Sequence, residues 1–189
     1  MVVRILRGKG PKRVLIVTAY RVSSDLAGPM TATMQKYRRT SKSNRDTNDT
    51  TRPIPRCQFI LDLQAWLDTF IIKNYSIILA MDANEEYKSQ DGSITPLTYK
   101  DGQHIKHPKH DGHLATLCKS CGLVDPFTII HTHSAPPPMY IRGSSRLDYT
   151  FVTASLIQNI ERAGIFPYNS VFFGDHRPCF VDFSASTLF

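Results

Sequence analysis

The sequence predicts a domain of the α/β (α+β) class, because short apolar strands alternate with amphipathic helices along the chain. The β-branched apolar runs Val14–Tyr20 and Tyr75–Met81 are typical of strands that are buried on both faces. Between these runs, Cys57–Lys73 carries apolar residues at helical spacing, which predicts a helix with one buried face. The length of 189 residues fits one domain, spanning residues 1–189.

The rest of the chain continues this alternation. We expect further helices over residues 29–39, Leu114–Cys121 (with Gly122 as the C-cap) and Ser155–Arg162. We expect further strands over Arg146–Thr153 and Pro178–Phe183, and a strand that carries His131 and His133. The polar, Gly- and Pro-rich stretches 40–56, 88–112 and 134–145 are expected to be loops.

Composition excludes several classes of protein. No apolar run approaches the roughly 20 residues that span a bilayer. Arg4 and Arg7 stand where a secretory signal needs an apolar stretch, so we expect an intracellular protein, with the nucleus as one compartment, and not a secreted one. The four cysteines are too few and too scattered to indicate a disulfide framework.

The charge is distributed unevenly along the chain. Residues 1–56 carry 13 basic and 3 acidic side chains, whereas the remainder carries 10 basic and 13 acidic ones. This pattern suits a phosphate-rich partner that the basic part binds while carboxylates act from the other part. A solvated basic surface without a partner is the alternative interpretation.

Three carboxylates stand at strand boundaries, where sites are commonly built on sheet proteins: Asp82, Asp148 and Asp175. Asn84 follows Asp82 by two residues, and His176 is adjacent to Asp175. Hydrolysis of a phosphodiester needs a base for water, a cation at the phosphoryl oxygens and a donor to the developing charge. These residue types can supply all three.

Five short motifs follow one another along the chain: Thr18–Tyr20 (TAY), Ile78–Asn84 (ILAMDAN), Gly122–Asp125 (GLVD), Arg146–Tyr149 (RLDY) and Gly174–Pro178 (GDHRP). Their order and rough spacing resemble the endonuclease/exonuclease/phosphatase superfamily, over nearly the whole chain. That superfamily includes apurinic endonucleases, deoxyribonucleases, sphingomyelinases, inositol-phosphate phosphatases and the endonucleases of non-LTR retroelements.

The resemblance implies a catalytic role for four of these side chains. Asp82 would orient or deprotonate the attacking water, and Asn84 would hydrogen-bond the scissile phosphate. His176 would donate to that phosphate, with its imidazole oriented and kept charged by Asp148.

The resemblance also implies contacts with phosphate and metal. Tyr20 matches a tyrosine that contacts phosphate, and Arg146 would touch the nucleic-acid backbone. Asp175 would contact the metal ion or its waters, with Mg²⁺ expected and Mn²⁺ as an alternative. Glu85 and Glu86 are expected to be solvated, with support of the site as the alternative for Glu85.

The implied fold is the C-terminal part of a four-layer α/β sandwich with two mixed β-sheets and helices outside. Gly174 replaces the serine that usually precedes the Asp-His pair. The residues before Val14 contain no acidic side chain, whereas the family carries its principal metal-binding Glu in strands that precede this one. We therefore expect a domain truncated at its N-terminus.

These features predict a metal-dependent phosphodiester hydrolase, of the retroelement or apurinic endonuclease type, whose partner is DNA in preference to RNA. A phosphatase or lipid phosphodiesterase of the same superfamily is one alternative. A catalytically dead nucleic-acid-binding remnant is another, because the metal-binding Glu is missing.

Two sets of Cys and His residues raise the question of a zinc site. Cys118 and Cys121 fall on an expected helix, where a pair three residues apart can face the core, and His131 and His133 would share one strand face. We favour core packing over zinc for both pairs. Four further histidines recur every three residues in an expected solvated loop: His104, His107, His110 and His113.

Overall fold

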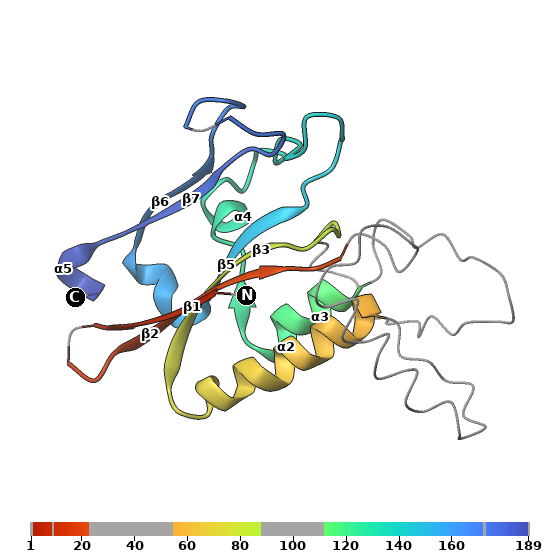
Figure 1. Cartoon of the computed structure of the whole chain (residues 1–189). Helices are drawn as coiled ribbons and strands as arrows, with labels where there is room; N and C mark the ends of the chain where they lie inside the picture. The colour runs from red at the N-terminus through yellow and green to blue at the C-terminus, as the bar shows by residue number, and fades with distance from the viewer. Residues whose placement is uncertain (1, 9, 23–54, 88–111, 172, 189) are drawn as a thin grey trace, which may run out of the picture.

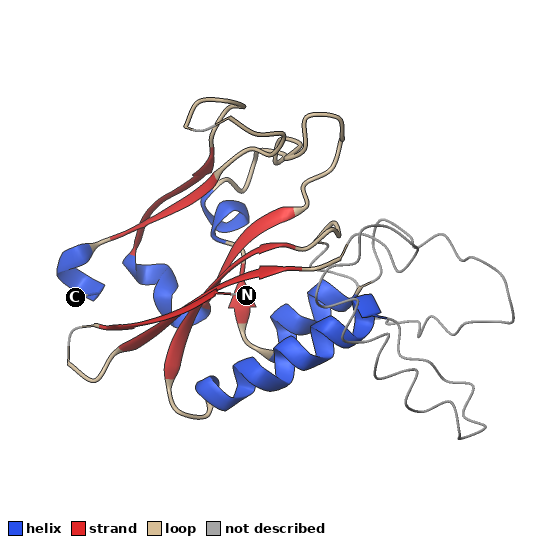
Figure 2. Ribbon diagram, in the orientation of Figure 1, coloured by secondary structure: helices blue, strands red, loops and turns tan. Residues whose placement is uncertain are grey.

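A computed structural model of the chain describes residues 2–8, 10–22, 55–87, 112–171 and 173–188, which form two β-sheets with helices packed around them (Figures 1 and 2). The strands are β1 (Val2–Arg7), β2 (Arg13–Tyr20), β3 (Tyr75–Asp82), β4 (Leu123–Val124), β5 (Asp148–Thr153), β6 (Ile160–Ile165) and β7 (Cys179–Phe183). The helices are α2 (Pro55–Ile71), α3 (His113–Ser120), α4 (Pro126–Ile130), α5 (Ala185–Leu188) and the 3₁₀ helix η1 (Ala154–Asn159). The α/β class predicted from the sequence is confirmed.

Part of the sequence-based prediction lies outside the described residues. This applies to the helix expected over residues 29–39 and to nearly all of the loops expected over 40–56 and 88–112.

The larger sheet is mixed and has the strand order β1-β2-β3-β5-β4. β2 and β3 run parallel, and α2 forms the crossover between them. β5 pairs antiparallel with β3, so its first residue lies beside the last residue of β3. The last residues of β2 and β3 and the first residue of β5 therefore lie at the same end of the sheet. Ligand sites of α/β proteins commonly lie at the ends of strands.

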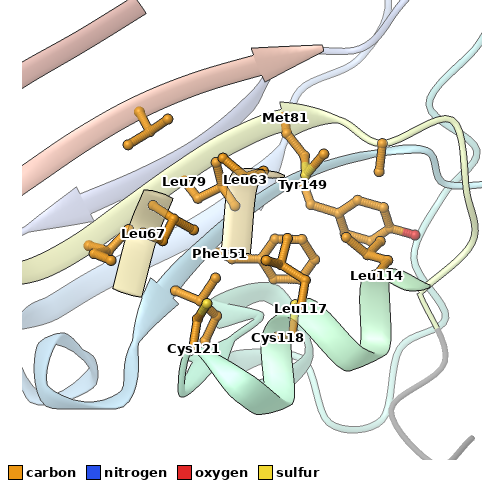
Figure 3. Close-up of a cluster of buried hydrophobic side chains, with 14 of the residues drawn as sticks. Leu63, Leu67, Leu79, Met81, Leu114, Leu117, Cys118, Cys121, Tyr149 and Phe151 are labelled. Carbon is orange, nitrogen blue, oxygen red and sulfur yellow. The ribbon is translucent and has the colours of Figure 1, made fainter. Parts of the chain in front are cut away.

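One face of the larger sheet is covered by α2 and α3, and the main core lies between them (Figure 3). The apolar residues of β2, β3 and β5 that point toward these helices alternate with residues on the opposite face, as expected for strands. The buried members from the helices and strands include Leu63, Leu67, Leu79, Met81, Leu114, Leu117, Tyr149 and Phe151.

The opposite face of the sheet is covered only over part of its length. A second buried cluster of Val14, Val152, Leu156 and Leu188 packs against Phe183 of β7. These residues lie at the end of the sheet where β2 and β3 begin and β5 finishes. The other end of this face, which carries Asp82, is left to polar side chains.

The structure corrects the prediction for residues 155–162. The helix expected over Ser155–Arg162 is a 3₁₀ helix that stops at Asn159, and Ile160 begins β6, which pairs antiparallel with β7. The spacing of Leu156, Ile157 and Ile160 favours a helix locally, but pairing with β7 overrides this preference.

The structure also corrects the strand expected around His131 and His133. Helix α4 occupies the preceding residues, because Asp125 accepts a hydrogen bond from the Phe127 N–H at 3.2 Å as an N-cap and Pro126 stands at the first helical position. Asp125 is therefore the N-cap of α4.

β1 is not among the strands expected from the sequence. The Gly-X-Gly-Pro stretch between Val2–Arg7 and β2 is typical of a hairpin turn and could have predicted a strand before it. Gly8 donates to the Lys12 carbonyl at 2.9 Å across this hairpin, and Gly10 takes a left-handed conformation with φ 67°.

Among the described residues, no helix combines the length and the apolar character that a membrane span requires.

We expect Leu67→Ala to lower the free energy of unfolding by about 2–5 kcal/mol, because Leu67 is fully buried between α2 and the sheet and its loss leaves a cavity. Leu61→Ala on the same helix is the matched control, since Leu61 is 55% exposed and should cost less than about 0.5 kcal/mol. Urea unfolding measures both. Equal effects would show that α2 is not packed as described.

Candidate active site

Three polar side chains form a row across the larger sheet. Tyr20 at the end of β2 is the register partner of Asp82 at the end of β3, and Asp82 is the register partner of Asp148 at the start of β5. Because directly opposed residues of paired strands share a face, all three side chains lie on the face opposite the main core. Tyr20 is 48% exposed, whereas both carboxylates are half-buried.

His176 completes this row from the loop before β7. Its Nδ1 lies 2.7 Å from Asp148 Oδ2. Its backbone forms a β-bridge with Tyr140, and the two rings lie 5.3 Å apart between centroids. Residues 139–141 therefore fix the position of the imidazole from one side while Asp148 fixes it from the other. The Asp148–His176 pair that the family resemblance implied is present in the structure.

Asp82, Asp148 and His176 line a shallow, open cavity of about 320 Å³ on the exposed end of the sheet face, and Tyr20 is not among its lining residues. Its polar lining comes from Asp82, Asp148, Thr150, His176 and Arg177. Asp82, Asp148 and His176 each place a potential ligand atom within 4.8 Å of the others, and they are the one such group of three or more among the described residues.

Burial of Asp82 and the nearby charge of Asp148 raise the pKa of the Asp82 carboxyl to about 6. The Asn84 N–H, which donates to Asp82 Oδ1 at 3.0 Å, opposes this shift without cancelling it. A carboxyl group with this pKa is ionised at neutral pH but still basic enough to accept a proton from water.

The pKa of His176 is raised above its usual value. Burial alone would lower it, but the hydrogen bond from His176 to Asp148 and the negative charge of Asp148 outweigh burial. Burial raises the pKa of Asp148 as well, although His176 opposes that shift. The pair therefore favours a charged imidazole that can donate a hydrogen bond from its other nitrogen.

Asn84 follows Asp82 by two residues and is fixed by hydrogen bonds to neighbouring segments of the chain. It takes a left-handed conformation with φ 48°, which asparagine tolerates better than most residues. Its side-chain nitrogen donates to the Arg21 carbonyl at 2.7 Å, and its own carbonyl accepts from Arg56 at 3.0 Å. Both ends of the residue are thus tied to the chain segments beside it.

Arg21 and Arg56, which make these hydrogen bonds with Asn84, form a buried ionic cluster with Glu85. Arg21 forms an ion pair with Glu85, and both side chains are fully buried. Glu85 also accepts from the backbone N–H groups of Gly112 and Leu114, at 3.0 and 3.3 Å. The prediction that Glu85 is solvated is therefore wrong, and its alternative role in support of the site agrees with these contacts.

Sequence reasoning missed the two arginines of this cluster. Arg21 directly follows the Thr18–Tyr20 motif and Arg56 directly precedes the predicted helix, so both had been counted only as part of the basic first third. A fully buried guanidinium has no signature in composition or periodicity.

Arg146 has a buried position instead of a surface one. It forms a bidentate ion pair with Asp125, at 2.6 and 3.1 Å, and its guanidinium lies over the rings of Phe127 and Tyr149. Its side chain is 7% exposed. These contacts make Arg146 a brace between α4 and β5, and its expected contact with nucleic acid stays an untested prediction.

Asp175 lies outside the group of three potential ligands. Its side chain is exposed, and its backbone carbonyl accepts from Ile141 at 2.8 Å. The metal contact predicted for Asp175 stays a prediction. Asp82 and Asp148 fit a hard divalent cation better, because two half-buried carboxylates that repel each other would be stabilised by one.

The cysteines and histidines considered for zinc do not form a group of three ligands in the described part of the chain. Cys118 and Cys121 are buried in the main core, and burial raises the pKa of Cys121 to about 12. The ring of His131 packs on Phe127, and His133 is exposed. Core packing, which the sequence favoured for the cysteines, agrees with these positions. His104, His107 and His110 lie outside the described residues. His113 begins α3 and is buried, so the expectation that it lies in a solvated loop is wrong.

Comparison with known proteins identifies the fold. No protein-family model and no curated protein matches the sequence. Similar solved structures include an AP endonuclease from Archaeoglobus fulgidus (14% identity, TM-score 0.52) and the catalytic domain of Xenopus laevis APE2 (17% identity, TM-score 0.53). A third is the 3′ phosphatase NExo from Neisseria, solved with a product DNA hairpin (16% identity, TM-score 0.53).

The similarity covers most of this chain but only part of each neighbour. The matches include 90%, 96% and 92% of this chain and 61%, 53% and 61% of the three neighbours, respectively. At these identities the comparison establishes the fold alone. The chain has the fold of these AP endonuclease and phosphatase structures and spans between 53% and 61% of their length.

We expect Asp82→Asn to stabilise the protein at pH 7.5 in EDTA by about 1–2 kcal/mol, after allowance for partial exposure. The folded-state pKa of about 6 lies above the ordinary value of 3.8, so the carboxylate destabilises the fold increasingly between these pH values and fully above pH 6. The gain should shrink below pH 6 and vanish near pH 4. Denaturant unfolding across this pH range measures it.

Asp62→Asn on α2 provides the control for this substitution, because Asp62 is exposed. A destabilised Asp82→Asn protein at pH 7.5, or a gain that does not depend on pH, would contradict the electrostatic account of the row.

We expect Arg146→Ala to lower the free energy of unfolding by about 3–5 kcal/mol, because it leaves the Asp125 carboxylate buried without its cation. The double variant Asp125→Ala/Arg146→Ala should lose less than the sum of the single losses. Thermal and denaturant unfolding of the three variants test this. A stable Arg146→Ala protein that binds nucleic acid more weakly would instead favour the surface role.

Proposed function

We propose that this chain is a metal-dependent phosphodiester hydrolase that acts on nucleic acid, as an endonuclease of the retroelement or apurinic type. One observation carries the proposal: the row of Tyr20, Asp82 and Asp148 with His176 hydrogen-bonded to its last member. Two carboxylates and an imidazole thus line one open cavity, which supports the roles of base and cationic donor proposed below.

Asp82 is the base in this proposal. Its carboxyl lies in the cavity, and its pKa of about 6 leaves it ionised at neutral pH while matching the task of taking a proton from water. The Asn84 N–H fixes the carboxylate through Oδ1, so that the second oxygen can orient the attacking water.

His176 stabilises the negative charge that develops on the phosphoryl oxygens. Asp148 holds Nδ1, so Nε2 is the nitrogen that can donate to phosphate. A donor fixed in advance toward the position of developing charge lowers the barrier more than a mobile one. Asp148 thus orients the imidazole and keeps it protonated.

Tyr20 and Asn84 flank the phosphate in this scheme. The phenol of Tyr20 stands next to Asp82 in the row and is exposed enough to donate to a bound phosphate. Asn84 is held by the Arg21 carbonyl and by Arg56, which fixes the residue beside Asp82.

A divalent cation, Mg²⁺ or Mn²⁺, would be held by Asp148 beside Asp82 and would neutralise charge on the phosphate. Asp82 would meet the cation only through the attacking water, which leaves its second oxygen available as the base. The residue that the sequence analysis assigned to the metal, Asp175, is exposed and could reach the ion only through water.

The choice of nucleic acid is supported by the neighbours and by the charge of the chain. The neighbours are two AP endonucleases and a phosphatase that was solved with a DNA hairpin. The excess of basic residues in the first 56 positions suits a polyanion. The Neisseria neighbour also favours a second candidate activity, removal of a 3′ phosphate from DNA.

We expect the purified chain to nick supercoiled plasmid with Mg²⁺ and not with EDTA. Asp82→Ala and His176→Ala should each lower the rate at least about 100-fold, because each removes a proton-transfer or charge-stabilising group. Gel electrophoresis of the plasmid measures nicking, and release of inorganic phosphate from a 3′-phosphorylated oligonucleotide measures the second activity.

His133→Ala is the matched control, because His133 is exposed and lies outside the cavity. A folded protein that neither nicks the plasmid nor releases phosphate would overturn the enzyme proposal and favour a binding remnant.

A further inference from the structure

The loop between β6 and β7, which the structure describes at residues 166–171 and 173–178, carries His176 and presents two apolar side chains to solvent. Phe173 is 93% exposed and Val171 is 57% exposed. Large apolar groups that cluster beside a polar site commonly mark a binding surface, because their exposure is otherwise unfavourable. Phe173 lies three residues before the imidazole that the proposed reaction uses.

The loop is held in place on one side by its own contacts. Asn169 takes a left-handed conformation with φ 58°, and its side chain accepts from the Gly174 N–H at 3.4 Å. The Ser170 hydroxyl donates to the Pro167 carbonyl at 2.8 Å. The exposure of Phe173 is therefore set by a loop with internal hydrogen bonds.

On its other side the loop is joined to residues 138–141. Tyr168 donates to the Pro138 carbonyl at 3.3 Å, and Arg177 donates its backbone N–H to Met139 at 2.8 Å. The neighbouring segment adds another exposed apolar side chain, Ile141, at 52% exposure (both segments lie at the top of Figure 1).

Arg177 adds a cation to this surface. Its guanidinium lies 4.3 Å from the centroid of the Tyr168 ring, which holds it flat. Its Nε is buried and has no hydrogen-bond partner among the described residues. A buried donor without an acceptor is unfavourable, so an incoming acceptor would be stabilised there. Arg177 also lines the cavity of Asp82 and His176.

We propose that this loop binds the nucleotide next to the scissile phosphate: Arg177 contacts the neighbouring phosphate and Phe173 stacks on an unpaired base. The inference rests on the proposed function and deepens it by naming single-stranded or locally unpaired nucleic acid as the preferred substrate. A nucleobase fits better than a protein surface, because the loop that carries the exposed ring of Phe173 also carries Arg177, a cation that lines the cavity.

Binding of a single-stranded 12-nucleotide DNA in EDTA, followed by fluorescence anisotropy, tests the stacking. We expect Phe173→Ala to raise Kd about tenfold. The loss should fall below about twofold with an oligomer of abasic sugar-phosphate units, because no base is present to stack. Ile72→Ala is the control: Ile72 is 81% exposed and lies just before β3 begins, at the far end of the sheet.

Phe173→Trp gives a direct readout of the contact. We expect its fluorescence to be quenched by the 12-nucleotide DNA and not by the abasic oligomer, with the wild-type protein, whose only tryptophan is Trp66, as the reference. Equal Kd values for Phe173→Ala and Ile72→Ala, or no quenching in Phe173→Trp, would overturn the stacking role.

The salt dependence of binding tests the phosphate contact. Arg177→Ala should reduce the slope of log affinity against log salt by about 0.7, the value for one phosphate contact on a single strand, whereas Arg177→Lys should keep the slope. An unchanged slope in a folded Arg177→Ala protein would overturn this contact.

These measurements are independent of catalysis. If the substitutions of Phe173 and Arg177 change DNA binding as expected but the protein does not nick plasmid, the proposed activity is overturned and the inference is supported. If the protein nicks plasmid but its DNA binding is unchanged by substitution of Phe173 and of Arg177, the proposed activity is supported and the inference about the loop is overturned.

Discussion

The site depends on one constraint: β3 pairs with β2 on one side and with β5 on the other, so two carboxylates become register neighbours. Asp82 and Asp148 cannot both be charged and half-buried without mutual repulsion. His176 relieves this on one side by hydrogen bonding to Asp148. Burial and the remaining repulsion from Asp148 together raise the pKa of Asp82. The fold thus gives two identical carboxyl groups different electrostatic environments through their neighbours.

Much of this arrangement could be predicted from the sequence, because its elements are local. The runs that became β2, β3 and α2 have strong periodicity, and Asp82 follows directly from the end of a buried strand. The pairing of Asp148 with His176 could be expected only through the family resemblance, since 28 residues separate them. Register across three strands is a tertiary property, and no pattern along the chain encodes it.

The errors have a common physical origin. Ile160–Ile165 has a weak alternation of apolar residues and became a strand because β7 was available as a partner. Glu85 looked like a surface residue, yet it is fully buried against Arg21 and the first backbone N–H groups of α3. In both cases a distant part of the chain supplied the decisive contact, so reasoning from local sequence selected the wrong environment.

The buried cluster of Arg21, Arg56 and Glu85 has a consequence for how this protein can vary. Arg56 donates to the carbonyl of Val22 at 2.7 Å, so the described residues on either side of 23–54 lie close together. Glu85 makes the same kind of contact with Gly112, across residues 88–111. Both contacts are made by buried side chains, Arg56 and Glu85, and both lie beside Asn84. Because the three charged side chains are buried together, a change at one of them must be matched at another, and the cluster therefore varies as a unit.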